Sequence, residues 1–169
     1  DKTAETIANI VSLRIPEKLG LDPVNDIQVI TPMHRGSLGT QALNRKLQDS
    51  LNPARESTFE IERFGARYRV GDKVIQTRNN YEKETLNGDI GKVIEISTDP
   101  GKVIIQFSGQ RTVSYEPGEL DEISPGFAIT VHKSQGSEFP CVVIPVSTQH
   151  FLLLQRNLLY TAITRGSQV

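Results

Sequence analysis

Four short runs of alternating residues follow one another in the middle of the chain, between residues 72 and 116. They read DKVIQT, GKVIEIS, KVIIQFS and RTVSYE, and the turn-forming segments LNGDIG, TDPG and SGQ separate them. Alternation with β-branched residues predicts strands, and glycine, asparagine and proline at the breaks predict tight turns. Four or five such strands within about 60 residues favour a small antiparallel β-barrel. We expect no α-helix between Phe59 and Ile123.

The sequence before these runs has a different pattern. Residues 3–15 place apolar side chains at helical spacing, and IQVITP (27–32) predicts a buried strand. The polar loop MHRGSLG then leads to a second amphipathic helix over about residues 38–51, with Ser37 as its N-cap. Pro16 is expected to end the first helix, because the residue before a proline avoids the α region.

The α/β pattern returns after the barrel segment. A short strand precedes the polar loop TVHKSQGSE, CVVIPV (141–146) predicts the next strand, and a helix is expected over roughly residues 152–165. We therefore predict one α/β domain with a parallel sheet, built from residues 1–60 and 125–169. Residues 61–124 are predicted to form the β-barrel, inserted into that domain.

Composition excludes several classes of protein. No run approaches the roughly 20 apolar residues needed to cross a bilayer, so no membrane span is expected. The single Cys141 cannot form an internal disulfide. A net charge of −1 does not indicate a free-standing nucleic-acid binder, which usually has a basic excess. The chain has no initiator methionine and RGSQV resembles the start of a strand, so we expect a piece of a longer protein.

Lys133 and Ser134 match the last two letters of the P-loop motif, G-x-x-x-x-G-K-[ST]. The alignment requires glycine at positions 127 and 132, where the chain has Phe127 and His132. A side chain at both positions keeps the backbone from wrapping phosphates, so a P-loop is excluded here.

Two polar loops follow strands of the predicted parallel sheet, where α/β proteins bind their ligands. MHRG carries Arg35, and the closing helix ends with Arg165 just before Gly166, a predicted helix C-cap. Taken singly, Arg35 suits a solvated loop and Arg165 complements the helix dipole. Together, two arginines at the ends of elements of one sheet suit a polyphosphate. Without a P-loop, they predict the half of a site that supplies an arginine finger across an interface.

Longer segments of the chain resemble one enzyme family. AITVHKSQGSEFPCVVIPV closely resembles motif V of the superfamily 1 DNA helicases, and RNLLYTAITRG resembles motif VI. VITPMHRGSLGTQALNRKLQDSLNP resembles the motif IV region of the RecD/TraA branch, superfamily 1B, and RVGDKVIQTRNNYEKETLNGDIGKVIEI resembles the SH3-like insert of that branch. The resemblance covers nearly the whole chain. It implies a RecA-like second motor domain, 2A, that lacks a P-loop and is interrupted by an SH3-like barrel, 2B.

The resemblance also implies nucleotide-binding roles. Arg165 and Arg35 match the arginines of motifs VI and IV that reach the γ-phosphate of ATP, so they are the expected catalytic residues. Gly136 and Glu138 match motif V positions near the γ-phosphate and the ribose.

Further positions are implied to contact DNA. Thr130, His132 and Lys133 match motif V positions that contact the backbone of a single strand or couple it to the nucleotide. Arg78 and Asn79 in the barrel are weaker DNA-binding candidates, since acidic residues interleave with the basic ones there and asparagine also favours turns.

As a whole, the resemblance implies the C-terminal motor region of an ATP-dependent 5′–3′ DNA helicase of the bacterial cytoplasm. It implies ATP with Mg²⁺, whose ligands lie outside this chain, so the chain alone is expected to be inactive and to bind no cofactor or metal. Expected partners are single-stranded DNA, an N-terminal RecA-like domain and subunits of a nuclease–helicase complex of the RecBCD type. The alternative is a non-catalytic DNA- or protein-binding module derived from this fold, which a parent gene without a P-loop would favour.

Overall fold

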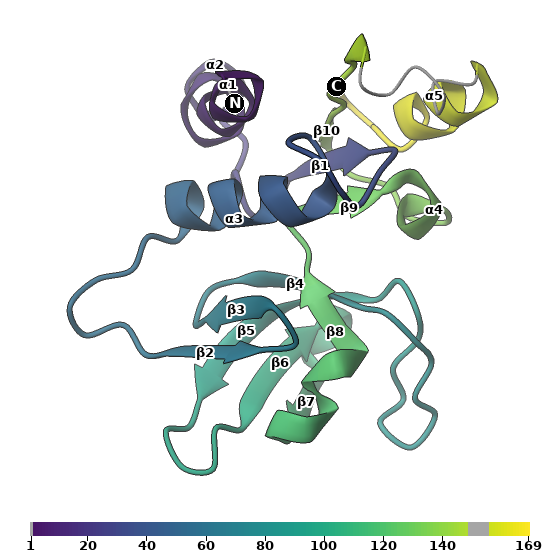
Figure 1. Ribbon diagram of the computed structural model, residues 1–169. Helices are drawn as coiled ribbons and strands as arrows, with labels where there is room; N and C mark the ends of the chain where they lie inside the picture. Colours follow the sequence, from purple (N-terminus) through teal and green to yellow (C-terminus); the bar gives the residue numbers. More distant parts are fainter. Residues whose placement is uncertain (1, 149–155) are drawn as a thin grey trace. The chain divides into compact units, whose positions relative to one another are not determined.

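The computed structural model describes residues 2–148 and 156–169, and the chain divides into two compact units (Figure 1). Unit 1 consists of residues 1–51 and 127–169, and unit 2 of residues 52–126. The divisions predicted from the sequence lie after residues 60 and 124. Asn52 accounts for the earlier division, because its side chain donates hydrogen bonds to Val70 O and to Asp72 Oδ1 at 3.0 and 2.8 Å.

Unit 1 contains a three-stranded parallel sheet in the order β10-β1-β9. The central strand β1 (Ile27–Thr31) pairs with β9 (Ala128–Thr130) on one side and β10 (Cys141–Val143) on the other. All five residues of β1 are buried, as expected for a parallel strand covered on both faces. The predicted α/β domain with a parallel sheet is confirmed.

The first helical segment continues past the predicted end. It comprises α1 (Lys2–Asn9), a π-helical turn η1 (Ile10–Arg14) and α2 (Ile15–Leu19), and it ends at Gly20 with φ of 66°. The expectation that Pro16 ends the helix is therefore wrong. Pro16 lies in the first turn of α2 after the π-helical turn, where a missing N–H is tolerated.

Helix α3 (Thr40–Leu51) packs against β9, and α1 packs against α3. It begins later than predicted, because the backbone carbonyls of residues 33–34 accept the N–H groups of its first residues. Ser37 therefore lies in the preceding loop and is not the N-cap. Within α3, the buried side chain of Asn44 forms two hydrogen bonds with the backbone of Ala128. Its Nδ2 donates to the Ala128 carbonyl and its Oδ1 accepts from the Ala128 N–H, each at 2.8 Å.

Two further helices complete unit 1. The short α4 (Val131–Ser134) follows β9 directly, and α5 (Arg156–Ile163) lies in the helix predicted over residues 152–165. Part of that prediction falls outside the described residues. Among the residues that are described, no helix is long and apolar enough to cross a membrane.

Unit 2 is built from antiparallel strands. Its five-stranded sheet has the order β7-β6-β5-β4-β8, and a separate hairpin consists of β2 and β3. The four runs of the sequence analysis correspond to β4, β5, β6 and β7, and residues 52–126 contain only 3-10 turns as helical elements, so the predicted barrel without an α-helix is confirmed. The hairpin and β8 were not predicted. The bounds are β2 Glu60–Arg63, β3 Ala66–Arg69, β4 Lys73–Gln76, β5 Ile90–Ile96, β6 Val103–Phe107, η2 Ser108–Gln110, β7 Thr112–Tyr115, η3 Pro117–Glu122 and β8 Ile123–Pro125.

The core of unit 2 depends on close approach of its strands. Gly91 in β5 faces β6, and a Cβ at this position would lie 2.6 Å from Ile105 Cγ2. Only glycine lets the two strands pair at this point. The apolar side chains between the strands are almost completely buried, among them Val74, Val93, Ile105 and Tyr115.

Candidate functional site

The three strands of unit 1 are parallel, so their carboxyl ends lie at one edge of the sheet. Residues 32–39 leave β1 at this edge and residues 131–140 leave β9 there. Arg35 lies in the first of these loops with an exposed side chain. No hydrogen bond or ion pair joins its guanidinium to another described residue.

The second loop begins with a capped helical turn. Thr130 is the N-cap of α4, and its Oγ1 accepts a hydrogen bond from Lys133 N at 3.3 Å. Ser134 is buried and donates its hydroxyl to Val131 O at 2.6 Å. The hydroxyl of the Lys-Ser pair is therefore used inside the turn, which agrees with the exclusion of a P-loop.

The basic side chains of this turn differ in their surroundings. His132 is exposed, whereas Lys133 is half-buried. Loss of hydration by burial lowers the pKa of the Lys133 ammonium. The turn thus places two basic side chains, His132 and Lys133, in the loop that follows β9.

Gly136 and Glu138 occupy the open part of the loop. Gly136 has φ of 80° and is exposed, and a Cβ on it would meet no atom within 4 Å. The carboxylate of Glu138 is exposed as well. The loop therefore presents an unobstructed backbone and an acidic side chain.

Arg165 is joined to the same loop through its backbone. Its carbonyl accepts a hydrogen bond from Phe139 N at 2.8 Å, and Ser167 N donates to Phe139 O at 2.8 Å. Gly166 pairs with Phe139 in a parallel β-bridge and does not adopt a positive φ. The expectation that Gly166 is the helix C-cap is therefore wrong, because α5 ends at Ile163 and Gly166 lies in the bridge to Phe139.

The guanidinium of Arg165 is weakly held. Its Nη1 donates to Ser137 O and its Nη2 to Thr164 Oγ1, both at 3.4 Å. Its buried Nε has no hydrogen-bond partner among residues 2–148 and 156–169. By contrast, Arg69 in unit 2 donates from Nε to Glu60 at 2.6 Å and from Nη1 to Asn52 O at 2.9 Å. Arg69 is a structural arginine, whereas Arg165 retains donor capacity for a ligand.

The two barrel residues of the predicted site lie in unit 2, in the loop between β4 and β5. Arg78 forms an ion pair with Asp121, and this hydrogen bond raises the pKa of the guanidinium. Asn79 accepts a hydrogen bond from Asn87 N at 2.8 Å and donates to Tyr81 Oη at 3.3 Å. Both side chains thus have partners within the barrel, in agreement with the turn role considered for Asn79.

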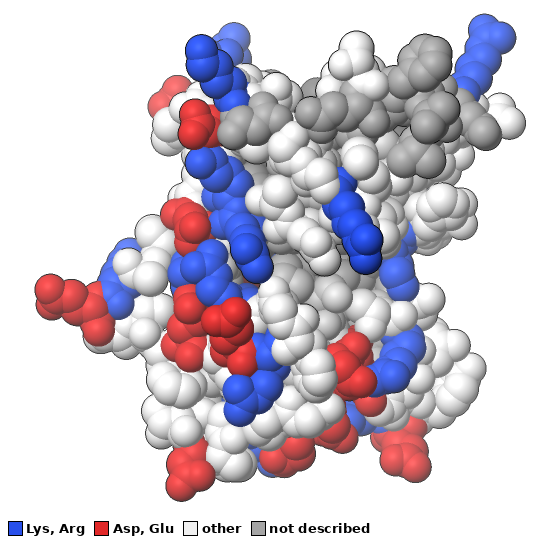
Figure 2. Space-filling model, viewed as in Figure 1, with Lys and Arg blue, Asp and Glu red and all other residues white. Residues whose placement is uncertain are grey.

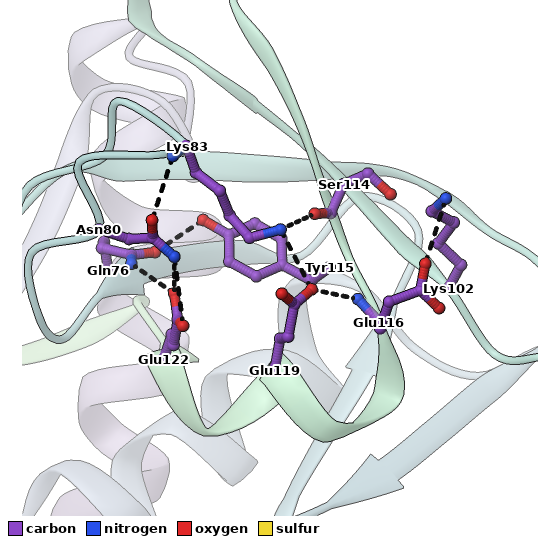
Figure 3. Close-up of polar contacts among 9 residues, drawn as sticks. All are labelled: Gln76, Asn80, Lys83, Lys102, Ser114, Tyr115, Glu116, Glu119 and Glu122. Atoms are coloured by element: carbon purple, nitrogen blue, oxygen red, sulfur yellow. Dashed lines mark hydrogen bonds and ion pairs between the residues drawn. The ribbon is translucent and has the colours of Figure 1, made fainter.

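A polar network anchors this loop to the barrel (Figure 3). The Tyr115 hydroxyl donates to Gln76 Oε1 at 2.7 Å, and Asn80 Nδ2 donates to Glu122 Oε2 at 3.1 Å. Lys83 Nζ donates to Glu119 Oε2 at 3.1 Å and lies 5.2 Å from the centre of the Tyr115 ring. The base of the loop is therefore held by directional contacts on several sides.

Basic side chains do not form a continuous surface on the one face drawn in Figure 2. Figure 2 shows basic and acidic side chains interspersed on the face drawn. Among residues 2–148 and 156–169, no three His, Cys, Asp or Glu side chains gather where they could hold a metal ion.

Two residues that shape the candidate site of unit 1 were not predicted from the sequence. Asn44 fixes β9 through Ala128, and Ser137 contacts Arg165 through its carbonyl. Asn44 is one of several polar residues in an amphipathic helix, and Ser137 contacts Arg165 through its backbone carbonyl. Neither leaves a signal in the sequence pattern.

Comparison with known proteins gives two family matches. Residues 43–107 match the SH3 domain of ATP-dependent RecD-like DNA helicases, and residues 125–168 match the C-terminal domain of UvrD-like helicases.

Curated relatives are similar to this chain in sequence, and a solved structure is similar to it in fold. The chain is 39% identical over 140 residues to the ATP-dependent RecD2 DNA helicase of Deinococcus radiodurans, covering 83% of this chain and 19% of the relative. It is 31% identical over 150 residues to the RecBCD enzyme subunit RecD of Mycolicibacterium smegmatis, covering 89% and 25%. The chain thus spans about a fifth to a quarter of the length of these relatives. The Bacteroides Pif1 helicase in complex with ADP-AlF3 and ssDNA shares the fold, with a TM-score of 0.63 and 19% identity over 95% of this chain and 42% of that chain.

Proposed function

The chain belongs to the RecD-like helicases of superfamily 1, and we propose that it supplies the arginine side of an ATP site whose phosphate cradle lies in another RecA-like domain of the intact enzyme. The intact enzyme would move 5′ to 3′ along single-stranded DNA. The main support for this proposal is the environment of Arg165. Its backbone is bound to the 131–140 loop, but its guanidinium makes only two long hydrogen bonds, and its Nε has no partner among the described residues.

Unit 1 supplies some of the groups that would bind the phosphate end of a nucleotide. Arg165 and exposed Arg35 offer guanidinium donors, which bind phosphate oxygens in a fixed bidentate geometry. Gly136 offers backbone without an obstructing side chain, and Glu138 offers an acceptor for a sugar hydroxyl. When bound, ATP supplies the phosphoanhydride bond whose cleavage powers movement. Mg²⁺ would be held by residues of the other domain.

In this proposal, Arg165 and Arg35 stabilise negative charge that develops on the transferring phosphoryl group. Because both arginines belong to this chain and the cradle does not, their contact requires the two domains to close. Closure would thus depend on the γ-phosphate, and reopening would follow its loss. The isolated chain would not hydrolyse ATP.

The DNA contacts of the proposal lie in both units. Thr130, His132 and Lys133 would meet the phosphate backbone of a single strand, where the Lys133 ammonium would attract phosphate oxygens. Arg78 and Asn79 would add contacts from the barrel, where Arg78 must exchange Asp121 for a phosphate. Partners would be an N-terminal RecA-like domain of the same protein and, as for the RecD relatives, subunits of a larger complex.

Replacement of Arg165 by alanine in the intact enzyme tests this function. We expect the DNA-stimulated ATPase rate to fall by about 10³–10⁵-fold, the range for arginine fingers. Arg156→Ala, which replaces an exposed arginine at the start of the preceding helix α5, is the matched control and should leave turnover nearly unchanged. Near-normal ATPase in Arg165→Ala would refute the assignment.

A further inference from the structure

The hairpin of β2 and β3 ends in an unusual tight turn. Arg63 pairs with Ala66, so only Phe64 and Gly65 form the connection. Their φ values are 51° and 76°. Positive φ at both central residues defines the type I′ turn, whose first position favours asparagine, aspartate or glycine.

Phe64 is a poor choice for this position on two grounds. A bulky side chain is disfavoured at positive φ, and such an outlier points to a constraint other than folding. The Phe64 side chain is also 66% exposed, so it gains little from burial. The other two non-glycine residues with positive φ, Glu84 and Gln110, are polar. Phe64 therefore serves neither the turn nor the core, and an external partner is the physical reason that remains.

The hairpin holds this phenylalanine in a fixed place. Ile61 and Tyr68, opposite each other in β2 and β3, are buried in the barrel core, and the Tyr68 hydroxyl donates to Ile123 O at 3.2 Å. Arg69 is buried at the base and bonds to Glu60. Because these contacts order the backbone in advance, a partner that binds the tip does not have to order it.

The side chains beside Phe64 indicate the chemistry of the partner. Arg63 directly precedes the turn and is exposed, and Arg67 follows it with Glu62 opposite in the ladder. The tip thus combines one flat apolar ring with a basic excess. Unpaired nucleobases stack on aromatic rings and on guanidinium planes, and their phosphates attract arginine.

We propose that Phe64 stacks on an unpaired base of a single-stranded nucleic acid, with Arg63 beside the neighbouring phosphate. This contact rests on the proposed function of the chain and adds a binding position in the barrel. It is separate from the 77–89 loop that carries Arg78 and Asn79.

Phe64→Asn and Phe64→Trp test the stack in the 169-residue chain. A fluorescently labelled oligothymidylate at low salt serves as the probe. Phe64→Asn is expected to weaken binding about tenfold, the effect of one lost base–aromatic stack, while thermal stability rises by roughly 2–4 °C because asparagine suits the turn. The chain contains no tryptophan, so Phe64→Trp introduces a single reporter that should retain binding and be quenched by the oligonucleotide.

Phe59→Asn is the control, since this aromatic residue is 41% exposed and precedes the same hairpin. It should leave affinity unchanged. Wild-type affinity in Phe64→Asn, or unquenched fluorescence of the tryptophan variant on saturation, would overturn the stack and leave the proposed function intact. Absence of binding by the wild-type chain would also overturn the stack, and it would not affect the proposed contacts of Arg165 and Arg35 with ATP.

Discussion

The Arg165 guanidinium turns back toward the loop between α4 and β10, where its Nη1 lies 3.4 Å from the carbonyl O of Ser137. This loop also contains Gly136 and Glu138. The backbone carbonyl of Arg165 is bound by Phe139 N at the end of the same loop. The segments that resemble motifs V and VI are therefore one structural piece, and the motion of one is expected to accompany the motion of the other.

Gly136→Ala separates a role at the ligand from a role in folding. Because a Cβ at this position meets no atom within 4 Å, the cost to folding is backbone strain alone, about 1 kcal/mol. A methyl group on the open loop would obstruct a nucleotide. We expect the ATPase rate of the intact enzyme to fall by more than tenfold while urea unfolding shifts only slightly. Equal losses of activity and stability would contradict a nucleotide-facing loop.

Asn44→Leu tests how β9 is held. The substitution leaves the N–H and the C=O of Ala128 buried without partners, so we expect the free energy of unfolding to decrease by about 2–4 kcal/mol. Gln41→Leu, an exposed position in the same helix, is the control and should change stability by less than about 0.5 kcal/mol. Urea denaturation measures both, and equal stabilities would show that the Asn44–Ala128 bonds are dispensable.

Tyr115 makes the barrel sensitive to alkaline pH. Burial raises the pKa of the Tyr115 phenol from its usual value of 10.0 to about 12. The folded state thus holds the phenol proton more tightly than the unfolded state, so this stabilisation is complete below pH 10 and is lost as pH rises toward 12. Unfolding free energies measured at intervals from pH 8 upward should decrease above pH 10.

Tyr115→Phe is the matched variant for that profile. It removes the phenol that titrates, so the decrease above pH 10 should be smaller. It also leaves Gln76 Oε1 without its donor, at a cost of about 1–2 kcal/mol near neutral pH. A profile as steep as that of the wild type would show that Tyr115 does not contribute to it.

Lys133→Gln tests the DNA contact through its dependence on salt. Each phosphate contact to a single strand contributes about 0.7 to the slope of log affinity against log salt concentration. We expect Lys133→Gln to reduce that slope by about this amount. Lys46→Gln alters an exposed ion pair with Glu5 in the same unit and should leave the slope unchanged. Identical slopes for wild type and Lys133→Gln would exclude a phosphate contact by Lys133.

Periodicity and turn residues predict the main elements because each depends on local sequence. The alternation of β4 to β7 and the apolar run of β1 are such patterns. The β2–β3 hairpin was missed because Phe64 occupies a turn position that usually carries a polar residue or glycine. The helix end at Gly20 was missed because a π-helical turn precedes Pro16 and lets the helix continue.

The residue types of the candidate site could be predicted from the sequence, but their contacts could not. Residue types and their order in the sequence were enough to indicate Arg35, Arg165 and the 131–140 loop. The weak partnering of Arg165 and the fixing of β9 by Asn44 depend on tertiary neighbours that no spacing encodes. These contacts distinguish a structural arginine such as Arg69 from one that retains donor capacity for a ligand.

The most direct measurement compares nucleotide affinities of the intact enzyme with and without Arg165. ADP with aluminium fluoride mimics the transferring phosphoryl group, whereas ADP alone lacks it. We predict that Arg165→Ala binds ADP like the wild type but loses at least tenfold in affinity for ADP with aluminium fluoride, since a charge-assisted hydrogen bond contributes about 1.5–3 kcal/mol. Equal affinity of wild type and variant for the aluminium fluoride complex would contradict the claim that Arg165 reaches the γ-phosphate.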